Sequence, residues 1–296
     1  MLSFLPVCLD NAMQLRAYME HQPFRSCDYT IGNIFQWRAY FSSQFAIAAN
    51  MLIMNVDYPG EGRYYTYPVG SGQMQDALSA IEQDAIECNR PLSFCCVPLE
   101  GVSVLQTRYG NRCRLSTRRD WADYLYGAQD LIAFAGKRYH SQRNHLNRFN
   151  KENPDAAFIP VQEDTLSRAI AFLDEYEKYA SINKIIEVEE MCRSKELLAH
   201  VMPLEQKAGF IDINGIIVAL AIGEVVGDTL YVHVEKARTD YAGAYQAIVS
   251  RFAAYACTEN ILYINREDDS GEEGLRYSKM AYRPIRLIDK YWADIQ

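Results

Sequence analysis

The 296-residue sequence lacks the short patterns that mark several large classes of enzyme. Its eight cysteines form no C-x-x-C pair and no Cys/His group with zinc spacing, so we expect no metal site. It contains no G-x-S-x-G, P-loop or H-E-x-x-H motif, and the turn at 70–72 lacks the third glycine of a dinucleotide-binding fingerprint. Serine-hydrolase, P-loop and zinc-protease chemistries are therefore poor candidates.

Long apolar runs and targeting signals are missing as well. The most apolar stretch, 45–56, is interrupted by Asn50 and Asn55, whereas a membrane span needs roughly 20 apolar residues. The first residues have no basic region and include Asp10, which is untypical of a signal peptide. Free thiols in a reducing cytosol are the simplest explanation of the cysteines, so we expect a cytoplasmic protein without an integral membrane segment.

The composition predicts real hydrophobic cores. Hydrophobic residues make up 49% of the chain and aromatic residues 12%, and the length suits two compact units. We find no low-complexity linker, and place an N-terminal domain at 1–128 and a C-terminal domain at 129–296. The formal net charge of -8 disfavours general binding to nucleic acid, although it allows a local phosphate-binding patch.

One order of strands and helices occurs twice. Apolar alternation and turn signals predict strands at 43–49, 51–57 and 63–69, a helix at 73–88, a strand at 92–97, a helix near 99–109 and a strand near 111–116. The second half predicts a strand at 156–161, helices at 164–180 and 187–200, strands at 209–213, 216–226 and 229–235, a helix at 241–257, a strand at 261–265, a helix from 271 and a strand near 285–288. This is the order of the GNAT (acyl-CoA N-acyltransferase-like) fold, so we expect an α/β protein with two tandem GNAT-like domains and mixed sheets.

Three stretches carry a family resemblance: GKRYHSQRNHLNRF (136–149), YVHVEKA (231–237) and INREDDSGEEGLRYSKMAYRP (264–284). Together they resemble soluble proteins that share the C-terminal domain of bacterial phosphatidylglycerol lysyltransferases. That family is similar to the Fem-type aminoacyltransferases, which are tandem GNAT domains. The resemblance implies transfer of an acyl or aminoacyl group to an amine or hydroxyl, with no required cofactor. The N-terminal copy has fewer polar clusters and is expected to be degenerate, so the active site is expected in the C-terminal copy.

The sequence departs from acyl-CoA users just before the helix at 241–257. Those proteins carry an Arg or Gln at the start of a glycine motif whose amides cradle the CoA diphosphate. Here Asp240 takes that place, while Gly243 still permits close backbone approach. Asp240 would repel a diphosphate, or it is simply the N-cap of the helix. Either interpretation makes aminoacyl-tRNA a better expected donor than acyl-CoA.

A cationic segment interrupts the acidic chain. No Asp or Glu occurs from 131 to 151, a stretch that includes Lys137, Arg138, Arg143, Arg148 and Lys151. Helical spacing places most of these cations and several amides on one face, with a packing stripe opposite. The face is either solvated or binds a phosphate-bearing donor or substrate, tRNA included. The binding residues expected here are Lys137, His140, Arg143, Asn144 and Asn147.

The remaining candidate residues follow two strands. Glu235 and Lys236 end the YVHVE strand, where a carboxylate could accept a proton from an attacking amine, or where the two could form an exposed ion pair. The polar residues after the next strand either line a crevice at the sheet edge or form an acidic loop. Ser270 and Glu273 match a capping box. The candidate catalytic residues are Glu235, Asn265 and Glu267, and the further binding residues are Lys236, Gly243, Tyr245, Arg266, Asp268 and Arg276.

Two hypotheses from different classes remain. The first is an acyl- or aminoacyltransferase that works by positioning and proton removal, without a metal or a covalent intermediate. The second is a catalytically silent GNAT-like module that binds RNA or a charged metabolite through the cationic segment. An ordinary acetyl-CoA-dependent N-acetyltransferase is a further alternative.

Overall fold

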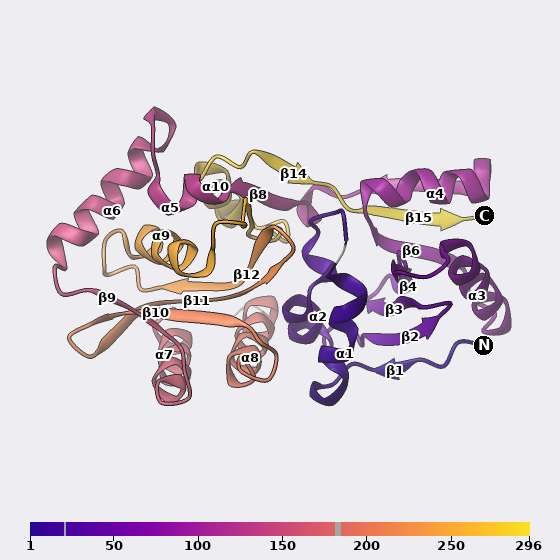
Figure 1. Ribbon diagram of the computed structural model, residues 1–296, viewed down its shortest axis with the longest axis horizontal. Coiled ribbons are helices and arrows are strands. Elements are labelled where there is room, and N and C mark those ends of the chain that lie inside the picture. The colour runs from indigo at the N-terminus through magenta and orange to yellow at the C-terminus, as the bar shows by residue number, and fades with distance from the viewer. Residues whose placement is uncertain (21, 181–184) are drawn as a thin grey trace. The chain divides into compact units, whose positions relative to one another are not determined.

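The computed structural model describes residues 1–20, 22–180 and 185–296, which form two compact units. Unit 1 comprises 1–123, 268–272 and 288–296, and unit 2 comprises 124–267 and 273–287 (Figure 1). This division differs from a single cut at 128/129, because two late segments of the chain belong to unit 1. Each unit is described by itself below.

Unit 1 is built on an eight-stranded sheet with the order β1-β2-β3-β4-β6-β15-β7, and β5 pairs with β3. Its strands are β1 (Leu5–Pro6), β2 (Gln44–Ala48), β3 (Met51–Tyr58), β4 (Gly62–Thr66), β5 (Val69–Gly70), β6 (Leu92–Val97), β7 (Cys113–Thr117) and β15 (Tyr291–Ile295). Its α-helices are α1 (Leu9–Met19), α2 (Ile31–Trp37), α3 (Met74–Glu87) and α4 (Leu99–Tyr109), and its short 3-10 helices are η1 (Cys27–Tyr29), η2 (Gly110–Arg112) and η3 (Arg119–Trp121).

Unit 2 is built on a seven-stranded sheet with the order β14-β8-β13-β12-β11-β10-β9. Its strands are β8 (Asp123–Gly127), β9 (Ala157–Pro160), β10 (Lys207–Ile213), β11 (Ile216–Val226), β12 (Thr229–Ala237), β13 (Tyr263–Asn265) and β14 (Arg286–Ile288). Its helices are α5 (Ala128–Ala133), η4 (Lys137–Tyr139), α6 (His140–Glu152), α7 (Leu166–Tyr179), α8 (Ile185–Ala199), α9 (Ala244–Ala256) and α10 (Glu273–Ala281).

The two sheets share one strand pattern, which confirms the tandem GNAT-like fold. In each, three antiparallel strands are followed by one parallel neighbour, β4 with β6 in unit 1 and β12 with β13 in unit 2. The next strand is antiparallel in both sheets, yet it comes from the other half of the chain. The C-terminal β15 pairs with β6 and β7, and β8, which follows β7, pairs with β13. Neither half of the sequence therefore contains all the strands of one sheet.

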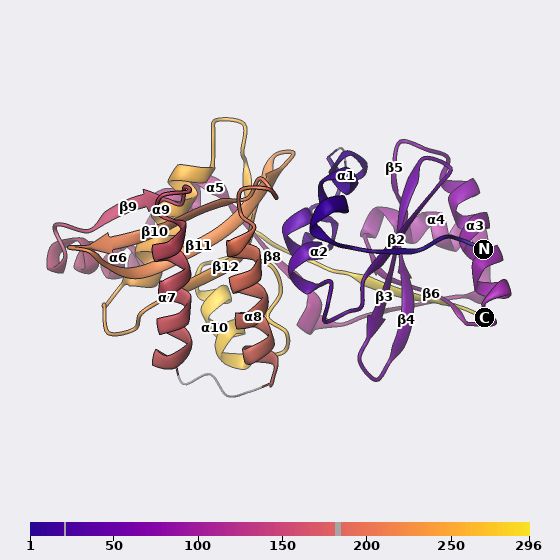
Figure 2. The same cartoon turned by 90° about the horizontal axis from the view of Figure 1, so that it is seen from below.

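Helices cover both faces of the unit 2 sheet. Helices α6 and α9 lie on one face and α7 and α8 on the other, as Figures 1 and 2 agree. Helix α7 buries an apolar stripe formed by Ala169, Phe172 and Leu173. At the β10–β11 hairpin, Asn214 and Gly215 adopt φ values of 51° and 91°, as the Asn-Gly turn signal predicts. Because helices cover both faces of the sheet, we look for functional polar groups at the ends of the central strands.

In the part of the chain that the structure describes, no helix is long and apolar enough to span a bilayer.

Candidate functional site

A β-bulge shapes the centre of the unit 2 sheet. Strand β11 pairs Ile222 with Val234 and then Gly223 with Val232, so His233 is the extra residue on β12. A Cβ on Gly223 would lie 2.2 Å from the carbonyl oxygen of Tyr231, so only glycine fits opposite the bulge. Bulges of this kind often re-aim side chains near active sites.

Strands β12 and β13 stay paired only over a short distance. Their parallel register ends at Tyr231 opposite Asn265, whereas β12 continues to Ala237. Beyond this last pair, β12 carries the polar residues His233 and Glu235, and Arg266 and Glu267 follow β13. The end of β12 and the chain after β13 thus bring together candidate side chains from two parts of the sequence.

Glu235 and Arg266 form a buried ion pair at this place. Arg266 Nη2 donates to Glu235 Oε1 at 2.8 Å, and the two side chains are only 10% and 12% exposed. The guanidinium lies over the ring of Tyr282, 4.5 Å from its centroid, and 5.7 Å from that of Tyr126. Burial raises the pKa of Glu235, and the Arg266 guanidinium only partly offsets that effect. In the described structure, Arg266 Nη1 is buried and has no hydrogen-bond partner.

His233 is held between two carboxylates. Its Nδ1 lies 2.7 Å from Glu267 Oε1, and its Nε2 lies 3.1 Å from Glu224 Oε1. Burial alone would lower the pKa of His233, but hydrogen bonds to the two carboxylates raise it to about 9. The imidazole is therefore protonated near neutral pH and donates through both nitrogens.

The turn after β13 is held by Asn265. Its Oδ1 accepts from the backbone N–H of Glu267 at 2.7 Å, and the residue is fully buried. Glu267 adopts a left-handed φ of 55°, which costs energy for a residue with a side chain. The structure thus joins Glu235 to Arg266, and Asn265 and Glu267 flank Arg266 in the turn.

Lys236 and Tyr245 contact residues other than the Glu235–Arg266 pair. Lys236 Nζ lies 2.7 Å from a carboxylate oxygen of Glu190, and the hydroxyls of Tyr245 and Tyr176 are 3.2 Å apart. Burial raises the pKa of Tyr245 above its ordinary range, so its hydroxyl stays protonated. Of the other candidates, Arg276 lies on α10, while Asp268 belongs to unit 1.

The cationic segment forms η4 and α6, as its periodicity predicts. Arg143 is half-buried, and its Nη1 donates to the backbone oxygens of Phe134 (2.6 Å) and Gly136 (3.0 Å). Arg138 pairs with Asp130. Lys137, His140, Asn144 and Asn147 are exposed.

Gly243 lies directly against α6. It precedes α9 with a φ of 86°, and a Cβ there would lie 2.2 Å from the carbonyl oxygen of His145. Gly243 is also the N-cap of α9. The expectation that Asp240 caps this helix is therefore wrong: Asp240 accepts from the Arg238 guanidinium at 2.8 and 3.2 Å.

The expected capping box at Ser270 is also absent. The Ser270 hydroxyl donates to Asp268 Oδ1 at 3.1 Å, and Ser270 itself has a φ of 47°. Helix α10 starts at Glu273 itself, so Glu273 is not the third helical residue that the box requires.

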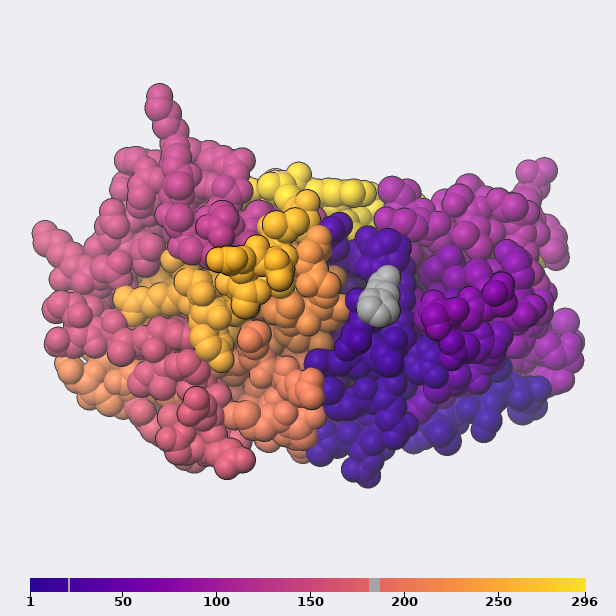
Figure 3. All heavy atoms as spheres, in the orientation of Figure 1, coloured from indigo at the N-terminus to yellow at the C-terminus, as the bar shows by residue number. Residues whose placement is uncertain are grey.

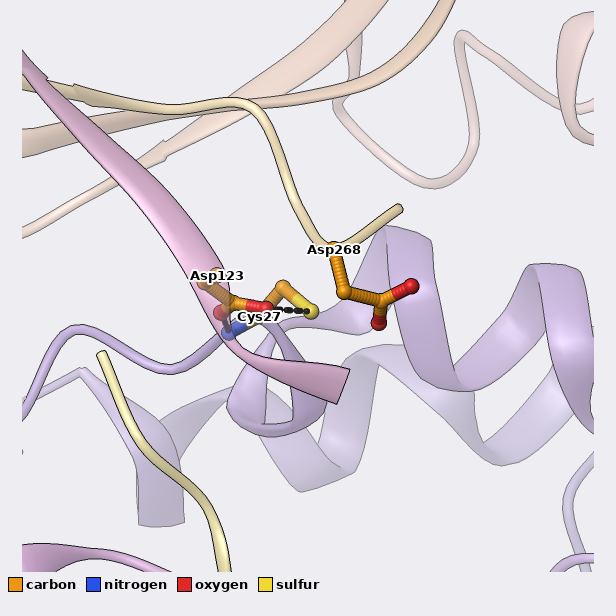
Figure 4. A group of neighbouring side chains, drawn as sticks. All are labelled: Cys27, Asp123 and Asp268. Carbon is orange, nitrogen blue, oxygen red and sulfur yellow. Dashed lines mark hydrogen bonds between the residues drawn. The ribbon is translucent and has the colours of Figure 1, made fainter. Parts of the chain in front are cut away.

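Unit 1 holds a separate buried cluster around Lys290. Its ammonium lies 2.8 Å from Asp123, 3.0 Å from Asp28 and 3.5 Å from Asp268. Cys27, Asp123 and Asp268 could in principle ligate a metal (Figure 4), but Lys290 Nζ also lies 3.3 Å from Cys27 Sγ and supplies the cation. Burial raises the pKa of Asp123 to about 6.

Comparison with known proteins places the chain in a family. The model of a family described as "Phosphatidylglycerol lysyltransferase, C-terminal" matches residues 20–294. The chain belongs to this family. The resemblance drawn from the three sequence stretches is thereby confirmed.

Solved structures agree with the fold. A crystal structure of a conserved protein of unknown function from Bacteroides thetaiotaomicron is 30% identical over the full length of both chains, with a TM-score of 0.91. The structure of L-PGS from Bacillus licheniformis is 14% identical, with 96% of this chain and 91% of that chain covered and a TM-score of 0.66. FemX is 8% identical, with 100% and 98% covered and a TM-score of 0.65.

One curated relative matches only in part. An uncharacterised protein of Mycoplasmoides gallisepticum is 24% identical over 180 residues, and the match spans 58% of this chain and 56% of that protein. This chain thus matches little more than half the length of that relative.

Sequence reasoning missed His233, Glu224 and Lys279. Lys279 is buried on α10, and its Nζ donates to the backbone oxygen of Arg266 at 2.7 Å. A histidine in the middle of an apolar strand was the one available signal for His233. Nothing in the sequence pairs it with Glu224, nine residues earlier on another strand.

Proposed function

We propose that this chain transfers an aminoacyl or other acyl group from an ester donor to an amine or hydroxyl acceptor at Glu235 and Arg266. One observation carries the proposal: a buried carboxylate with a raised pKa lies beside a guanidinium, where β12 and β13 separate within a GNAT-like sheet. The family and the fold shared with FemX support this class of reaction. The substrates that those names imply belong to the relatives and do not identify the acceptor of this chain.

In the proposed step, the acceptor nitrogen or oxygen attacks the carbonyl carbon of the donor ester. Glu235 takes the proton of the attacking group, and the carbonyl oxygen becomes an oxyanion. A new bond from carbon to the acceptor forms, the ester carbon–oxygen bond breaks, and Glu235 returns the proton to the leaving hydroxyl. Arg266 Nη1, a donor without a partner in the described structure, can then bind the oxyanion once the site opens. The step needs no metal and no covalent intermediate.

The contact between α9 and α6 favours a donor other than acyl-CoA. A diphosphate would have to approach the first amides of α9 closely. The backbone of α6 lies against Gly243 at this helix end, and Asp240, paired with Arg238, stands where acyl-CoA users carry an Arg or Gln. Aminoacyl-tRNA, whose reactive end is a ribose ester, is therefore the proposed donor.

A transfer assay with a matched variant tests the proposal. Mixed tRNA charged with radiolabelled amino acids is incubated with the protein and with lipid and small-molecule fractions of a bacterial extract. We expect label to move from tRNA to an acceptor, and Glu235→Gln to slow that transfer at least ~100-fold. If no label moves with any fraction while RNA or a metabolite still binds, the silent binding module is the better account. Calorimetry with acetyl-CoA serves as a further control, since micromolar binding would favour an N-acetyltransferase.

A further inference from the structure

The outer face of α6 carries exposed cationic and amide side chains. His140, Asn144, Asn147 and Lys151 are all exposed and recur at intervals of four, three and four residues. Their rise along the helix is about 6, 4.5 and 6 Å, so the row extends over roughly 16 Å. Lys137 is exposed just before the helix.

This face is held rigidly from behind. Phe149 is fully buried, Gln142 donates to the backbone oxygen of Ala281 at 2.6 Å, and Arg251 donates to Asn150 at 2.9 Å. Arg143 fixes the turn that leads into α6 through its two backbone contacts. The helix that carries the exposed row is therefore held in place, and a ligand would only have to order the exposed side chains.

The cations on this face are not neutralised locally. The only acidic residue of α6 is Glu152, which accepts from Arg148 at 2.7 Å. In the described part of the chain, the structure records no ion pair for Lys137 or Lys151. This is unusual in a chain with a net charge of -8, where a solvated helix normally carries compensating carboxylates.

We infer that the outer face of α6, made of Lys137, His140, Asn144, Asn147 and Lys151, binds the phosphate backbone of an RNA. A row of about 16 Å suits a chain of successive phosphates better than one small anion, whose ligands would have to converge. The face carries no large apolar side chain, which disfavours insertion into a lipid surface. Lysines contact phosphates, and Asn and His can also reach sugar hydroxyls.

The helix that carries this face also packs on the chain that leaves β12. The opposite side of α6, at His145 and Phe149, contacts Gly243, which follows the end of β12 by six residues. An RNA on the outer face would thus lie on the helix against which the loop after the strand of Glu235 packs. The inference rests on the proposed function only in taking the RNA to be the carrier of the donor.

Fluorescence anisotropy with labelled, uncharged total tRNA tests the surface. With two to three neutralised phosphates, the affinity of the unmodified protein should fall roughly 10- to 40-fold between about 50 and 200 mM salt. Lys137→Glu with Lys151→Glu should weaken binding at least ~10-fold and make the salt slope shallower by about 2. Lys178→Glu is the matched control: this exposed lysine lies on α7, across the sheet from α6 (Figure 2), and should change affinity by less than about twofold.

Several results would overturn the inference: no binding of tRNA at low salt, unchanged binding by the double variant, or an equal loss with Lys178→Glu. Loss of binding to anionic phospholipid vesicles, with tRNA binding kept, would make the face a lipid surface instead. Glu235→Gln separates the two proposals, because it should bind tRNA normally. If the unmodified protein transfers no label but the double variant loses tRNA binding, the RNA-binding surface is supported and the proposed function is not.

Discussion

Glu235 Oε1 accepts a hydrogen bond of 2.8 Å from Arg266 Nη2; Glu235 lies four residues beyond Tyr231, and Arg266 directly follows Asn265, the last parallel pair of β12 and β13. The pair thus joins two segments that are about thirty residues apart in sequence and come together only through parallel strand pairing. Because the guanidinium is buried and stays protonated, its charge is compensated by the Glu235 carboxylate. The same carboxylate is the proposed proton acceptor, so stability and activity are coupled at this position.

Truncation of Glu235 should therefore affect the fold, and a neutral isostere mainly the chemistry. Glu235→Ala leaves a buried, uncompensated guanidinium and should destabilise the protein by about 3–5 kcal/mol. Glu235→Gln keeps a hydrogen-bond acceptor for Arg266 and should cost less than the Ala variant, while transfer still falls at least ~100-fold. Urea unfolding and the transfer assay measure both effects. Equal unfolding free energies for the native protein and Glu235→Ala would contradict the buried ion pair.

The His233 group should make stability depend on pH. The pKa of His233 is about 9 in the fold and about 6.5 in an unfolded chain, so its contribution is fully present below about 6.5. That contribution is lost as the pH rises through 9, and it amounts to at most about 3 kcal/mol. The free energy of unfolding, measured with urea from pH 6 to 10, should fall across this window.

His233→Gln is the control for this pH dependence. Gln can still donate to one carboxylate but cannot titrate, so its unfolding free energy should change less between pH 6.5 and 9.5. NMR of the histidine ring nitrogens provides a direct measurement: both should carry protons at pH 7.5. A neutral ring at that pH would show the assignment of charge to be wrong.

Two glycines with similar φ values allow the cost of backbone strain to be measured separately from the cost of steric overlap. Gly215 and Gly243 have φ values of 91° and 86°, but a Cβ on Gly215 meets nothing within 4 Å, whereas one on Gly243 meets the backbone of α6 at 2.2 Å. Gly215→Ala should cost about 1–2 kcal/mol from the left-handed backbone alone. Gly243→Ala should cost an additional ~1–3 kcal/mol because α6 has to move. Equal losses of unfolding free energy would mean that α6 is not packed tightly on Gly243.

Much of this architecture was predictable from local patterns, and the exceptions share a cause. The strands from Met51 to Tyr58 and from Ile216 to Val226, and helix α6, follow apolar periodicity that neighbouring residues fix. Strands β8 and β15 were not predicted, because each is short and finds its partners in the other half of the sequence. The failed capping prediction at Asp240 has a similar origin, since helix α9 begins where Gly243 meets α6.

The candidate site likewise contains some residues that local patterns predict and others that they do not. Glu235 and the Asn265–Glu267 run were found because polar residues ended apolar strands. The contact of His233 with Glu224 depends on a bulge and on pairing between strands, which no local pattern specifies. Lys290 was missed for the same reason: its three carboxylate neighbours lie at 28, 123 and 268, and only the folded sheet brings them together.

Lys290 and β15 lead to a last prediction about unit 1. Burial alone would lower the pKa of Lys290, but Asp123 and Asp28 raise it well above its ordinary value, so the ammonium is permanently charged. Lys290→Met would leave buried carboxylates without their cation and should destabilise the protein by about 3–5 kcal/mol, whereas Lys178→Met on exposed α7 should cost less than about 0.5 kcal/mol. Since β15 lies between β6 and β7, the loss should be local to unit 1. Hydrogen exchange followed by mass spectrometry should then show faster exchange in β6 and β7, with β11 and β12 of unit 2 unchanged. Uniformly faster exchange in both sheets would show instead that the two units unfold as one, and unchanged exchange in β6 would show that Lys290 does not hold the C-terminal strand in place.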